Sequence, residues 1–466
     1  MRNNILIILM ISVFSFLITS CETDNNNIIS STEPNLQQVG DDGFTERSLE
    51  KKSKGMVGIN VLLNTSINDE YLAELSNYGH VMDTFVKLNA VRIKAKESEL
   101  EGIRALSFVK SANPDAERHG RPVDRVSVDN FAGGMSTWNL DVINVTEGPS
   151  GSRSVTEDGS GVYIGVLDSG LLDSWRSYFA DERIAEDYAK SFGGGGASGT
   201  NVSEQPNKWE HDQDSHGTHV TSTILGYSLG GTTFVNGVAP MSTVIPVKVL
   251  NQNGSGWSSV IARGIMYMAE LKEGPLSGAP VVINMSLGGS YFDPLEEAAI
   301  DYAIDAGVII VASAGNGGEA GMGYPGAYQP VISVAMSGWD REWEIGTWWF
   351  TIDIPEGSAP ASSYYIDDWS SRELPGQELD VTAPGSWIVG PYQTNSGQLS
   401  YYYLGGTSMA SPHVAGLVAL MAQNHVALTA SEAESLLKGN TLWIIGFDSD
   451  EQGSGLVQAD LVLAAM

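Results

Sequence analysis

The sequence predicts an α/β fold in which helices cover both faces of a parallel sheet, with a small α+β domain ahead of it. Short apolar runs without polar/apolar alternation point to strands that are buried on both faces. Helical patterns separate these runs along the chain, as in βαβ units. The segment 55–117 has a strand and helix pattern of its own, which indicates a separate small domain.

The first residues resemble an export signal. Arg2 precedes an apolar run over 5–18, and the four residues ending at Cys21 resemble a bacterial lipobox. We therefore assign 1–20 as a lipoprotein signal peptide, Cys21 as the lipidation site and the polar segment 21–54 as a flexible tether. An ordinary secretory signal with an incidental cysteine is the alternative. Because Cys21 is the only cysteine, the folded body has neither an internal disulfide nor a cysteine nucleophile.

The small domain is predicted to be a split βαβ layer of the ferredoxin-like type. The expected elements are a strand, a helix, a strand or hairpin, a second helix and a last strand, over 57–63, 70–75, 81–93, 97–106 and from 108. The segment 118–135 follows, with charges, glycines and a proline, and it is predicted to be an accessible processing linker. The main domain then occupies 136–466.

In the main domain we expect strands over 162–167, 244–250, 281–285, 308–312 and 331–335, and helices that start near His216, Ser258, Leu295 and Ser408. Functional sites of such sheets lie at the carboxyl ends of the strands. The composition restricts the classes of binding partner, since 25 basic against 56 acidic residues give a net charge of −31. Nucleic acid is excluded as a partner because its binding requires neutralisation of phosphates by Lys and Arg.

Polar residues stand where this architecture puts a site. Asp168 follows the apolar run VYIGVL, His216 opens a helix in HGTHV, Asn316 follows another strand, and Ser408 opens a helix in GGTSMASPHVAG. Taken singly, each fits a turn or a helix cap. His216 and His219 at i,i+3 would also suit a metal, but no third ligand or HExxH glutamate accompanies them.

Taken together, Asp168, His216 and Ser408 occur in the order Asp, His, Ser, and the motifs DSG, HGTHV and GTSMASP resemble those of the subtilisin-like serine proteases. The resemblance implies that Ser408 is the nucleophile, His216 the general base and acid, and Asp168 the carboxylate that orients the imidazole. It also implies that Asn316 is the side-chain donor of the oxyanion hole.

The same resemblance implies an extended peptide-binding cleft. One edge is Gly254, Ser255 and Gly256, and the other is Ser286, Leu287, Gly288 and Gly289. Gly323, Tyr324 and Pro325 would form the floor of the primary specificity pocket, and Ala314 and Gly315 would also bind substrate. Glycines suit edges against which a peptide backbone must lie. Gly323 leaves room in the pocket, so we expect a large apolar residue before the cut. Trp257 is interpreted either as the wall of a subsite or as core packing.

The small domain resembles the pro-segment of this family, an intramolecular chaperone and inhibitor, and the chain ends as such catalytic domains do.

Two features depart from the family. The segment 337–365 is an insertion rich in aromatic residues, namely Trp339, Trp343, Trp348, Trp349, Tyr364 and Tyr365, for which function and covering of core are both open. The loop 226–238 lacks the calcium ligands seen in many relatives, so structural calcium is left open and without a location.

The sequence thus predicts an exported, membrane-anchored serine endopeptidase that is made as a self-processing zymogen and needs no cofactor for its chemistry. Its partners would be peptide substrates, its own propeptide and a membrane. The alternative is a catalytically silent peptide-binding protein of the same fold. A lipase or esterase is disfavoured by the order of the triad and by Ala410, where a G-x-S-x-G motif needs glycine.

Overall fold

The computed structural model describes residues 55–127, 138–147, 152–193, 208–231, 233–342 and 361–466. The predicted signal peptide, the tether and Cys21 lie outside these residues, as do Trp343, Trp348 and Trp349. Within the described ranges, none of the helices combines the length and the apolar character needed to cross a bilayer.

The small domain is an antiparallel four-stranded sheet in the order β2-β3-β1-β4, with two helices. Its elements are β1 (Met56–Leu63), α2 (Asp69–Leu75), β2 (Gly79–Phe85), β3 (Ala90–Lys96), α3 (Leu100–Arg104) and β4 (Val109–Pro114). The fully buried side chains of Ile59, Val61 and Ile93 pack against Leu75 and Ile103 of the helices. The predicted ferredoxin-like layer is confirmed. The second helix is shorter than expected because residues 97–99 form a 3-10 turn.

The main domain is built on a ten-stranded sheet, and all five predicted strands belong to it. Its order is β10 (Lys190–Ser191), β13 (Thr243–Lys248), β9 (Tyr163–Asp168), β15 (Val281–Met285), β16 (Val308–Ser313), β17 (Ile332–Trp339), β19 (Val381–Pro384), β23 (Leu456–Val457) and β22 (Thr441–Leu442), with β18 (Tyr364–Ile366) beside β17. Neighbouring strands are parallel except β22 with β23 and β18 with β17.

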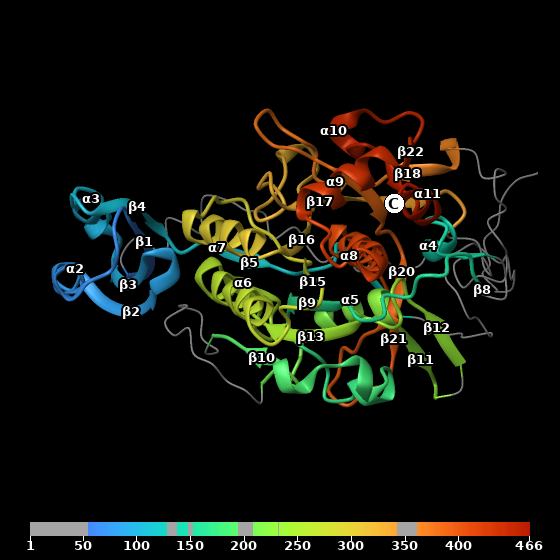
Figure 1. Cartoon of the computed structure of the whole chain (residues 1–466), viewed down its shortest axis with the longest axis horizontal. Helices are drawn as coiled ribbons and strands as arrows, with labels where there is room; N and C mark the ends of the chain where they lie inside the picture. The colour runs from blue at the N-terminus through green and yellow to red at the C-terminus, as the bar shows by residue number, and fades with distance from the viewer. Residues whose placement is uncertain (1–54, 128–137, 148–151, 194–207, 232, 343–360) are drawn as a thin grey trace, which may run out of the picture. The chain divides into compact units, whose positions relative to one another are not determined.

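Helices cover both faces of this sheet, as predicted (Figure 1). The pair α5 (His216–Leu225) and α8 (Thr407–Asn424) packs in one core, and the pair α6 (Ser258–Glu273) and α7 (Pro294–Asp305) packs in another. In β15 the consecutive residues Val282 and Ile283 belong to different cores. Because successive strand side chains point to opposite faces, a strand between two helical layers must be apolar throughout.

Several shorter elements complete the fold. Seven short strands form three small antiparallel sheets: β11 (Gly226–Leu229) with β12 (Thr233–Asn236), β7 (Thr146–Glu147) with β8 (Ser152–Arg153), and β20 (Ile388–Pro391) with β21 (Tyr401–Gly405) and β6 (Asp124–Ser127). The remaining helices are α4 (Trp138–Asp141), α9 (Ala430–Gly439), α10 (Ser449–Gln452) and α11 (Ala459–Ala464). A capping box of Thr429 and Glu432 starts α9.

The described ends of the aromatic insertion are structural. Trp339 ends β17 and is buried, and Tyr364 of β18 is buried beside it. The Tyr365 hydroxyl donates to the buried carboxylate of Glu342 at 2.6 Å. Of the two interpretations left open, covering of core describes these ends, while the middle of the insertion lies outside the described residues.

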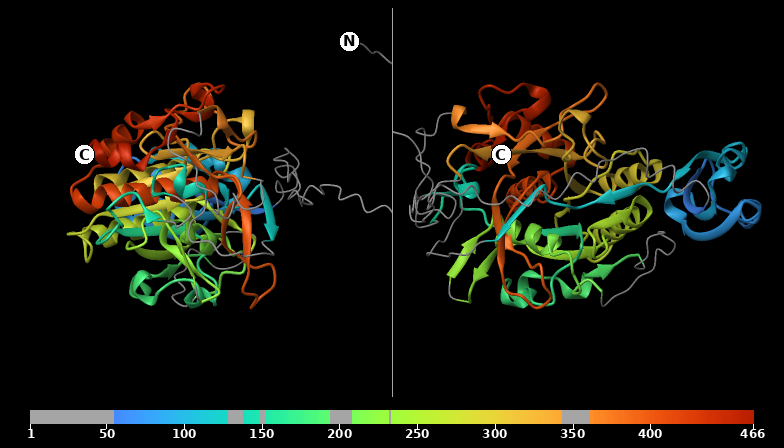
Figure 2. Two further views of the ribbon diagram at one scale, coloured as in Figure 1. Left: turned by 90° about the vertical axis from the view of Figure 1, so that its right-hand side faces the viewer. Right: turned by 180° about the vertical axis from the view of Figure 1, so that it is seen from behind.

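The start of the predicted linker is not an open segment. Strand β5 (Glu117–His119) pairs antiparallel with β14 (Ser255–Trp257), and β6 pairs with β21. Figures 1 and 2 show this stretch, in cyan, running from the small domain along the main domain. Arg118 is fully buried. The expected accessibility is therefore wrong for Arg118, because strand pairing takes its backbone into the main domain.

Candidate active site

Asp168 and His216 are in direct contact at the carboxyl end of the sheet. Asp168 is the last residue of β9, His216 is the first residue of α5, and His216 Nδ1 lies 2.9 Å from both carboxylate oxygens of Asp168. Both side chains are fully buried. Ser215, just before the helix, has a left-handed backbone (φ 75°). A Cβ at Gly217 would lie 3.2 Å from atoms of Asp168, so the glycine allows helix and carboxylate to approach.

The charges around this pair raise the pKa of the His216 imidazole. Burial alone would lower the pKa of His216, but the carboxylate of Asp168 outweighs burial and raises this pKa, with support from Asp214 and Asp212. Burial raises the pKa of Asp212 to about 7 and that of Asp214 to about 6. The Lys248 ammonium donates to the backbone oxygen of Ser169 within the same cluster.

Ser408 lies in the first turn of α8, as predicted, and is 3% exposed. Its hydroxyl donates to the backbone oxygen of Ser286 at 3.2 Å, and the Ser286 hydroxyl donates back to the Ser408 backbone oxygen at 2.7 Å. His216 Nε2 is buried without a hydrogen-bond partner among the described residues. That nitrogen is therefore an available proton acceptor. Gly406, rather than Thr407 or Ser408, is the N-cap of the helix.

His219 and His413 are packing residues. His219 Nε2 lies 3.0 Å from the Ile388 backbone oxygen, and burial lowers the pKa of His219 to about 3. His413 lies 2.9 Å from the Met409 backbone oxygen and 2.6 Å from the Asn139 amide. Burial also lowers the pKa of His413 to about 4, whereas His216 is the imidazole that lies against a carboxylate, which favours His216 as the base.

The Asn316 amide is held with its N-H2 group directed at a backbone carbonyl. Its oxygen accepts from the Thr407 backbone N-H at 2.9 Å and from the Thr407 hydroxyl at 2.8 Å. Its Nδ2 donates to the backbone oxygen of Arg121 at 3.4 Å. The carbonyl of Arg121 thus takes the position at which an amide donor would meet a developing oxyanion.

The residues before Arg121 lie as an extended strand between the two predicted edges. His119 exchanges two backbone hydrogen bonds with Gly288, at 2.8 and 2.9 Å, and the Gly120 N-H donates to the Gly254 oxygen at 2.9 Å. Ser255 and Gly256 pair with His119 and Arg118. The structure therefore brings the predicted edge residues together around a peptide segment of the chain itself. A Cβ at Gly120 would lie 3.3 Å from His216 Cε1.

The residues predicted for the primary pocket lie side by side. The Gly323 N-H donates to the Ala314 oxygen, and Gly289 and Tyr324 exchange two backbone hydrogen bonds. The Gly315 N-H donates to the Thr407 hydroxyl at 3.2 Å. Leu287 is buried in the core next to this edge. The expectation of a large apolar residue before the cut stays a prediction.

The guanidinium of Arg121 lies on the other side of the segment. Its Nε and Nη2 donate to the Asn253 backbone oxygen at 3.1 and 2.9 Å. A cavity of about 650 Å³ opens here, and its lining includes Asp214, Tyr392 and Trp257. Trp257 therefore lines a cavity beside the cleft and also packs against the core of α6 and α7, so both interpretations describe it.

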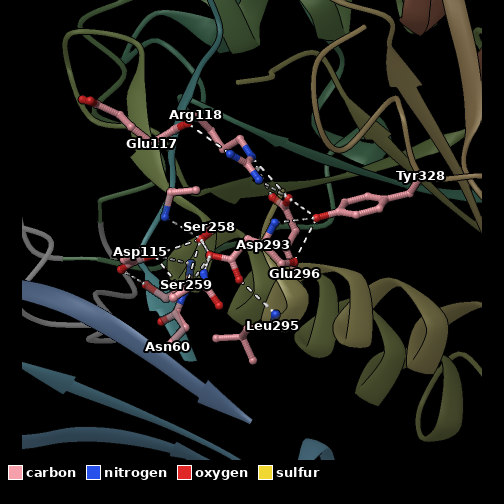
Figure 3. Close-up of polar contacts among 12 residues, drawn as sticks. Asn60, Asp115, Glu117, Arg118, Ser258, Ser259, Asp293, Leu295, Glu296 and Tyr328 are labelled. Carbon is pink, nitrogen blue, oxygen red and sulfur yellow. Dashed lines mark hydrogen bonds and ion pairs between the residues drawn. The ribbon is translucent and has the colours of Figure 1, made fainter. Parts of the chain in front are cut away.

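The small domain is joined to the main domain by a buried polar cluster at the start of α6 and α7 (Figure 3). Asp115 accepts from the Ser259 backbone N-H at 3.0 Å and from its hydroxyl at 2.6 Å. The Asn60 amide donates to Asp293 Oδ2 at 2.9 Å and to Asp115 Oδ1 at 3.2 Å. Asp115 thereby supplies the side-chain cap that α6 lacks from its own Trp257.

Among the described residues, one group of three carboxylates, Glu378, Asp380 and Glu434, is compact enough for a metal ion. The ammonium of Lys438 contacts all three, at 2.5, 3.0 and 3.3 Å, and so already compensates their charge. Calcium stays an open expectation.

Two groups near the cleft were not identified from the sequence. The charge of Asp214 acts on the His216 imidazole, and Glu296 in the first turn of α7 binds Arg118. The pattern DPLEE does signal a helix start, with Asp293 as cap and Pro294 at the first position. It gives no sign that Glu296 points to the cleft.

Comparison with known proteins agrees with this geometry. The family model described as "Subtilase family" matches residues 159–457, which contain Asp168, His216, Asn316 and Ser408. The chain belongs to the subtilase family. It is a serine endopeptidase of that family, with the subtilisin-like fold.

Individual relatives place the chain within this family. Subtilisin DY of Bacillus licheniformis is 34% identical over 306 residues, which cover 65% of this chain and 90% of that protein. A thermostable alkaline protease of Halalkalibacterium halodurans is 30% identical over 381 residues, 81% of this chain and 84% of that protein. The structure of fervidolysin, a keratinolytic enzyme from Fervidobacterium pennivorans, matches in fold with a TM-score of 0.63 at 22% identity, over 88% of this chain and 61% of its own.

Proposed function

We propose that this subtilase cleaves peptide bonds with Asp168, His216 and Ser408 as its catalytic triad. The observation that carries the proposal is the seating of residues 118–121: an extended peptide lies between two glycine-rich edges, and the carbonyl of Arg121 meets the Asn316 amide. Ser408 and the unpartnered Nε2 of His216 belong to the same site. These features suit acyl transfer better than peptide binding alone.

In the proposed reaction, Ser408 Oγ forms a bond to the carbonyl carbon while its proton passes to His216 Nε2. The oxyanion accepts hydrogen bonds from Asn316 Nδ2 and from the Ser408 backbone N-H. His216 then gives its proton to the leaving amine, the C-N bond breaks and an acyl-enzyme remains. Water attacks the ester carbonyl with His216 again as base, the bond to Ser408 Oγ breaks, and His216 returns the proton to Oγ as the acid product leaves. Asp168 keeps the Nδ1 proton in place and stabilises the imidazolium throughout.

We also propose that the chain is made as a zymogen, with residues 55–117 as its inhibitory module. Two contacts support this: the module's Asp115 caps α6, and the segment that follows fills the cleft. A substrate cannot use the two edges while His119 and Gly120 occupy them. Removal of this segment by cleavage would open the site. The residue after Arg121 is Pro122, and the position of this segment in the cleft does not by itself identify the first bond cut during maturation. Sequencing the N-terminus of the mature protein identifies that bond.

The test uses a fluorophosphonate probe on the mature enzyme. We expect Ser408 to be labelled and the Ser408→Ala variant to stay unlabelled while it accumulates as a precursor that retains residues 55–117. Ser411→Ala is a matched control, because Ser411 lies on the same helix and its hydroxyl donates to Asn284 instead. A processed, folded wild-type protein without labelling would refute the catalytic role. Normal trimming of Ser408→Ala would assign maturation to a separate protease.

We further propose that the chain is exported and held at a membrane through a lipid on Cys21. The apolar run over 5–18 and the lipobox-like residues before Cys21 support this, and one relative from Thermus is by name an extracellular serine proteinase. Cys21→Ala should release the protein from the membrane fraction. Unchanged partitioning of that variant would overturn the anchor.

A further inference from the structure

The side chain of Arg118 fills a buried pocket of the main domain. Arg118 is the fourth residue before the bond that follows the Arg121 carbonyl, which meets the Asn316 amide. Its guanidinium makes a two-pronged ion pair with Glu296: Nη2 lies 2.6 Å from Oε2, and Nε lies 3.1 and 3.2 Å from the two oxygens (Figure 3). Both side chains are 0% exposed.

The walls of this pocket come from the main domain. Glu296 lies in the first turn of α7, and the Tyr328 hydroxyl, which donates to the Asp293 backbone oxygen at 2.9 Å, lies 3.4 Å from Glu296 Oε2. The rings of Phe292 and Tyr324 pack against Tyr328 with centroids 5.7 and 4.8 Å away. The pocket is therefore held in shape by contacts that do not involve the small domain.

The absence of a side chain at Gly289 leaves space for the guanidinium of Arg118. A Cβ at Gly289 would lie 3.2 Å from Nη1 of Arg118 and 3.4 Å from its Cδ, closer than most real contacts. The same residue belongs to the edge that holds the peptide backbone. The edge and the pocket thus accommodate one residue together, with its backbone paired to Gly256 of β14 and its charge on Glu296.

Once the segment leaves the cleft, Glu296 becomes a carboxylate in a buried pocket without a cation. Within the described ranges, Arg118 provides the ion pair of Glu296, and the carboxylate of Asp293 is a further charge that acts on Glu296. A buried charge without its partner is costly, so the open pocket favours a ligand that restores the pair. Burial raises the pKa of Glu296, and Arg118 opposes this shift.

We propose that Glu296 selects substrates with arginine at the fourth residue before the cleaved bond. The inference rests on the proposed function, because it takes the cleft around residues 118–121 as the substrate site. A substrate strand in the same register brings its own fourth residue to the same pocket. Arginine is favoured over lysine because a planar fork can meet both carboxylate oxygens, as Arg118 does, whereas an ammonium is a point charge.

The experiment measures kcat/KM of the mature enzyme on internally quenched peptides that differ only at this position. Arginine, lysine and citrulline are compared, because citrulline keeps the shape of arginine without its charge. We expect arginine to exceed citrulline by roughly 30-fold, since loss of one partner of a buried charge pair costs at least about 2 kcal/mol. Lysine should fall between them.

The Glu296→Gln variant tests the residue. It should bring the arginine and citrulline peptides to within about threefold of each other, while Glu297→Gln, a half-buried neighbour on the same helix, should keep the preference. Active-site titration with the fluorophosphonate probe corrects for misfolded protein. If the variant does not fold at all, the ratio of kcat/KM for the arginine and citrulline peptides with the wild-type enzyme decides whether the preference for arginine exists.

The outcomes separate the inference from the proposed function. Cleavage of all the peptides with equal arginine and citrulline rates would overturn the role of Glu296 and leave the peptidase intact, with Arg118 as an anchor of the inhibitory segment only. A preference that survives Glu296→Gln would place the recognition elsewhere. Probe labelling and cleavage that are both absent in the wild type would overturn the proposed function and the inference with it.

Discussion

Substitution of Asn60 should weaken the interface between the small domain and the main domain without changing a residue of the active site. Asn60 Nδ2 donates across the interface to Asp293 at 2.9 Å and to the Ser258 hydroxyl at 3.4 Å, and the side chain is 0% exposed. Asn60→Leu keeps a similar volume and removes these donors. Among the described residues Asn60 Oδ1 has no hydrogen-bond partner, so the apolar side chain removes one unsatisfied atom while it loses the hydrogen bonds of Nδ2.

The expected loss is about 2 kcal/mol. A hydrogen bond to a charged acceptor contributes about 1.5–3 kcal/mol, and Asp293 keeps other donors in Asn113 at 3.0 Å and in Ser258. A loss of 2 kcal/mol raises the population of the open cleft about 30-fold. The N-H of Gly288, which donates to the His119 oxygen at 2.9 Å, reports this opening through its hydrogen exchange.

The assay compares amide exchange in uncleaved precursors that carry Ser408→Ala. Gly288 should exchange about 30-fold faster in the Asn60→Leu precursor, while the N-H of Ile283 in the central strand keeps its rate. Asn64→Leu is the control, because the exposed Asn64 amide donates only within the small domain, to Ser107. A change at Gly288 of less than about fivefold, or an equal change at Ile283, would refute the reasoning.

Two further predictions concern the catalytic group. Asp214→Asn should lower the pKa of His216, because it removes a negative charge that stabilises the imidazolium. Since the base must be neutral, the acid limb of kcat/KM against pH then moves to lower pH; the exposed Asp305→Asn should leave it in place, and a shift to higher pH would contradict the assignment. Asn316→Ala should lower kcat roughly 100- to 1000-fold with little effect on KM, a magnitude known for such oxyanion donors in this family rather than obtained from the present structure. A variant with near-normal kcat would remove Asn316 from the oxyanion hole.

The architecture was largely predictable because burial on both faces leaves a direct trace in sequence. Strands such as 281–285 read as uninterrupted apolar runs, and the helices between them read with helical spacing. Boundaries were less certain. The second helix of the small domain was predicted over 97–106 and is 100–104, because a 3-10 turn precedes it. The strands of the 364–366 and 401–405 segments are short and paired at the periphery, where apolar periodicity is weak.

For the site, too, part could be predicted from the sequence and part is visible only in the fold. Asp168, His216 and Ser408 could be named from the sequence since each stands at a strand end or helix start in a recognisable motif, and the order of the motifs restricts the family. The fold then shows that Asp168 and His216 meet at 2.9 Å, while the Ser408 hydroxyl is turned to the Ser286 oxygen.

Only the tertiary structure shows which charged residues pair with each other. Arg118 read as part of an accessible linker and Glu296 as an acidic residue at a helix start, and their positions are 178 residues apart. Local pattern reflects which face of an element is buried, but a pair formed by chain segments so distant leaves no periodicity to detect. The sequence by itself predicted the fold class and the family; the folded chain alone shows that residues 118–121 lie between the two glycine-rich edges and that the buried carboxylate of Glu296 binds Arg118.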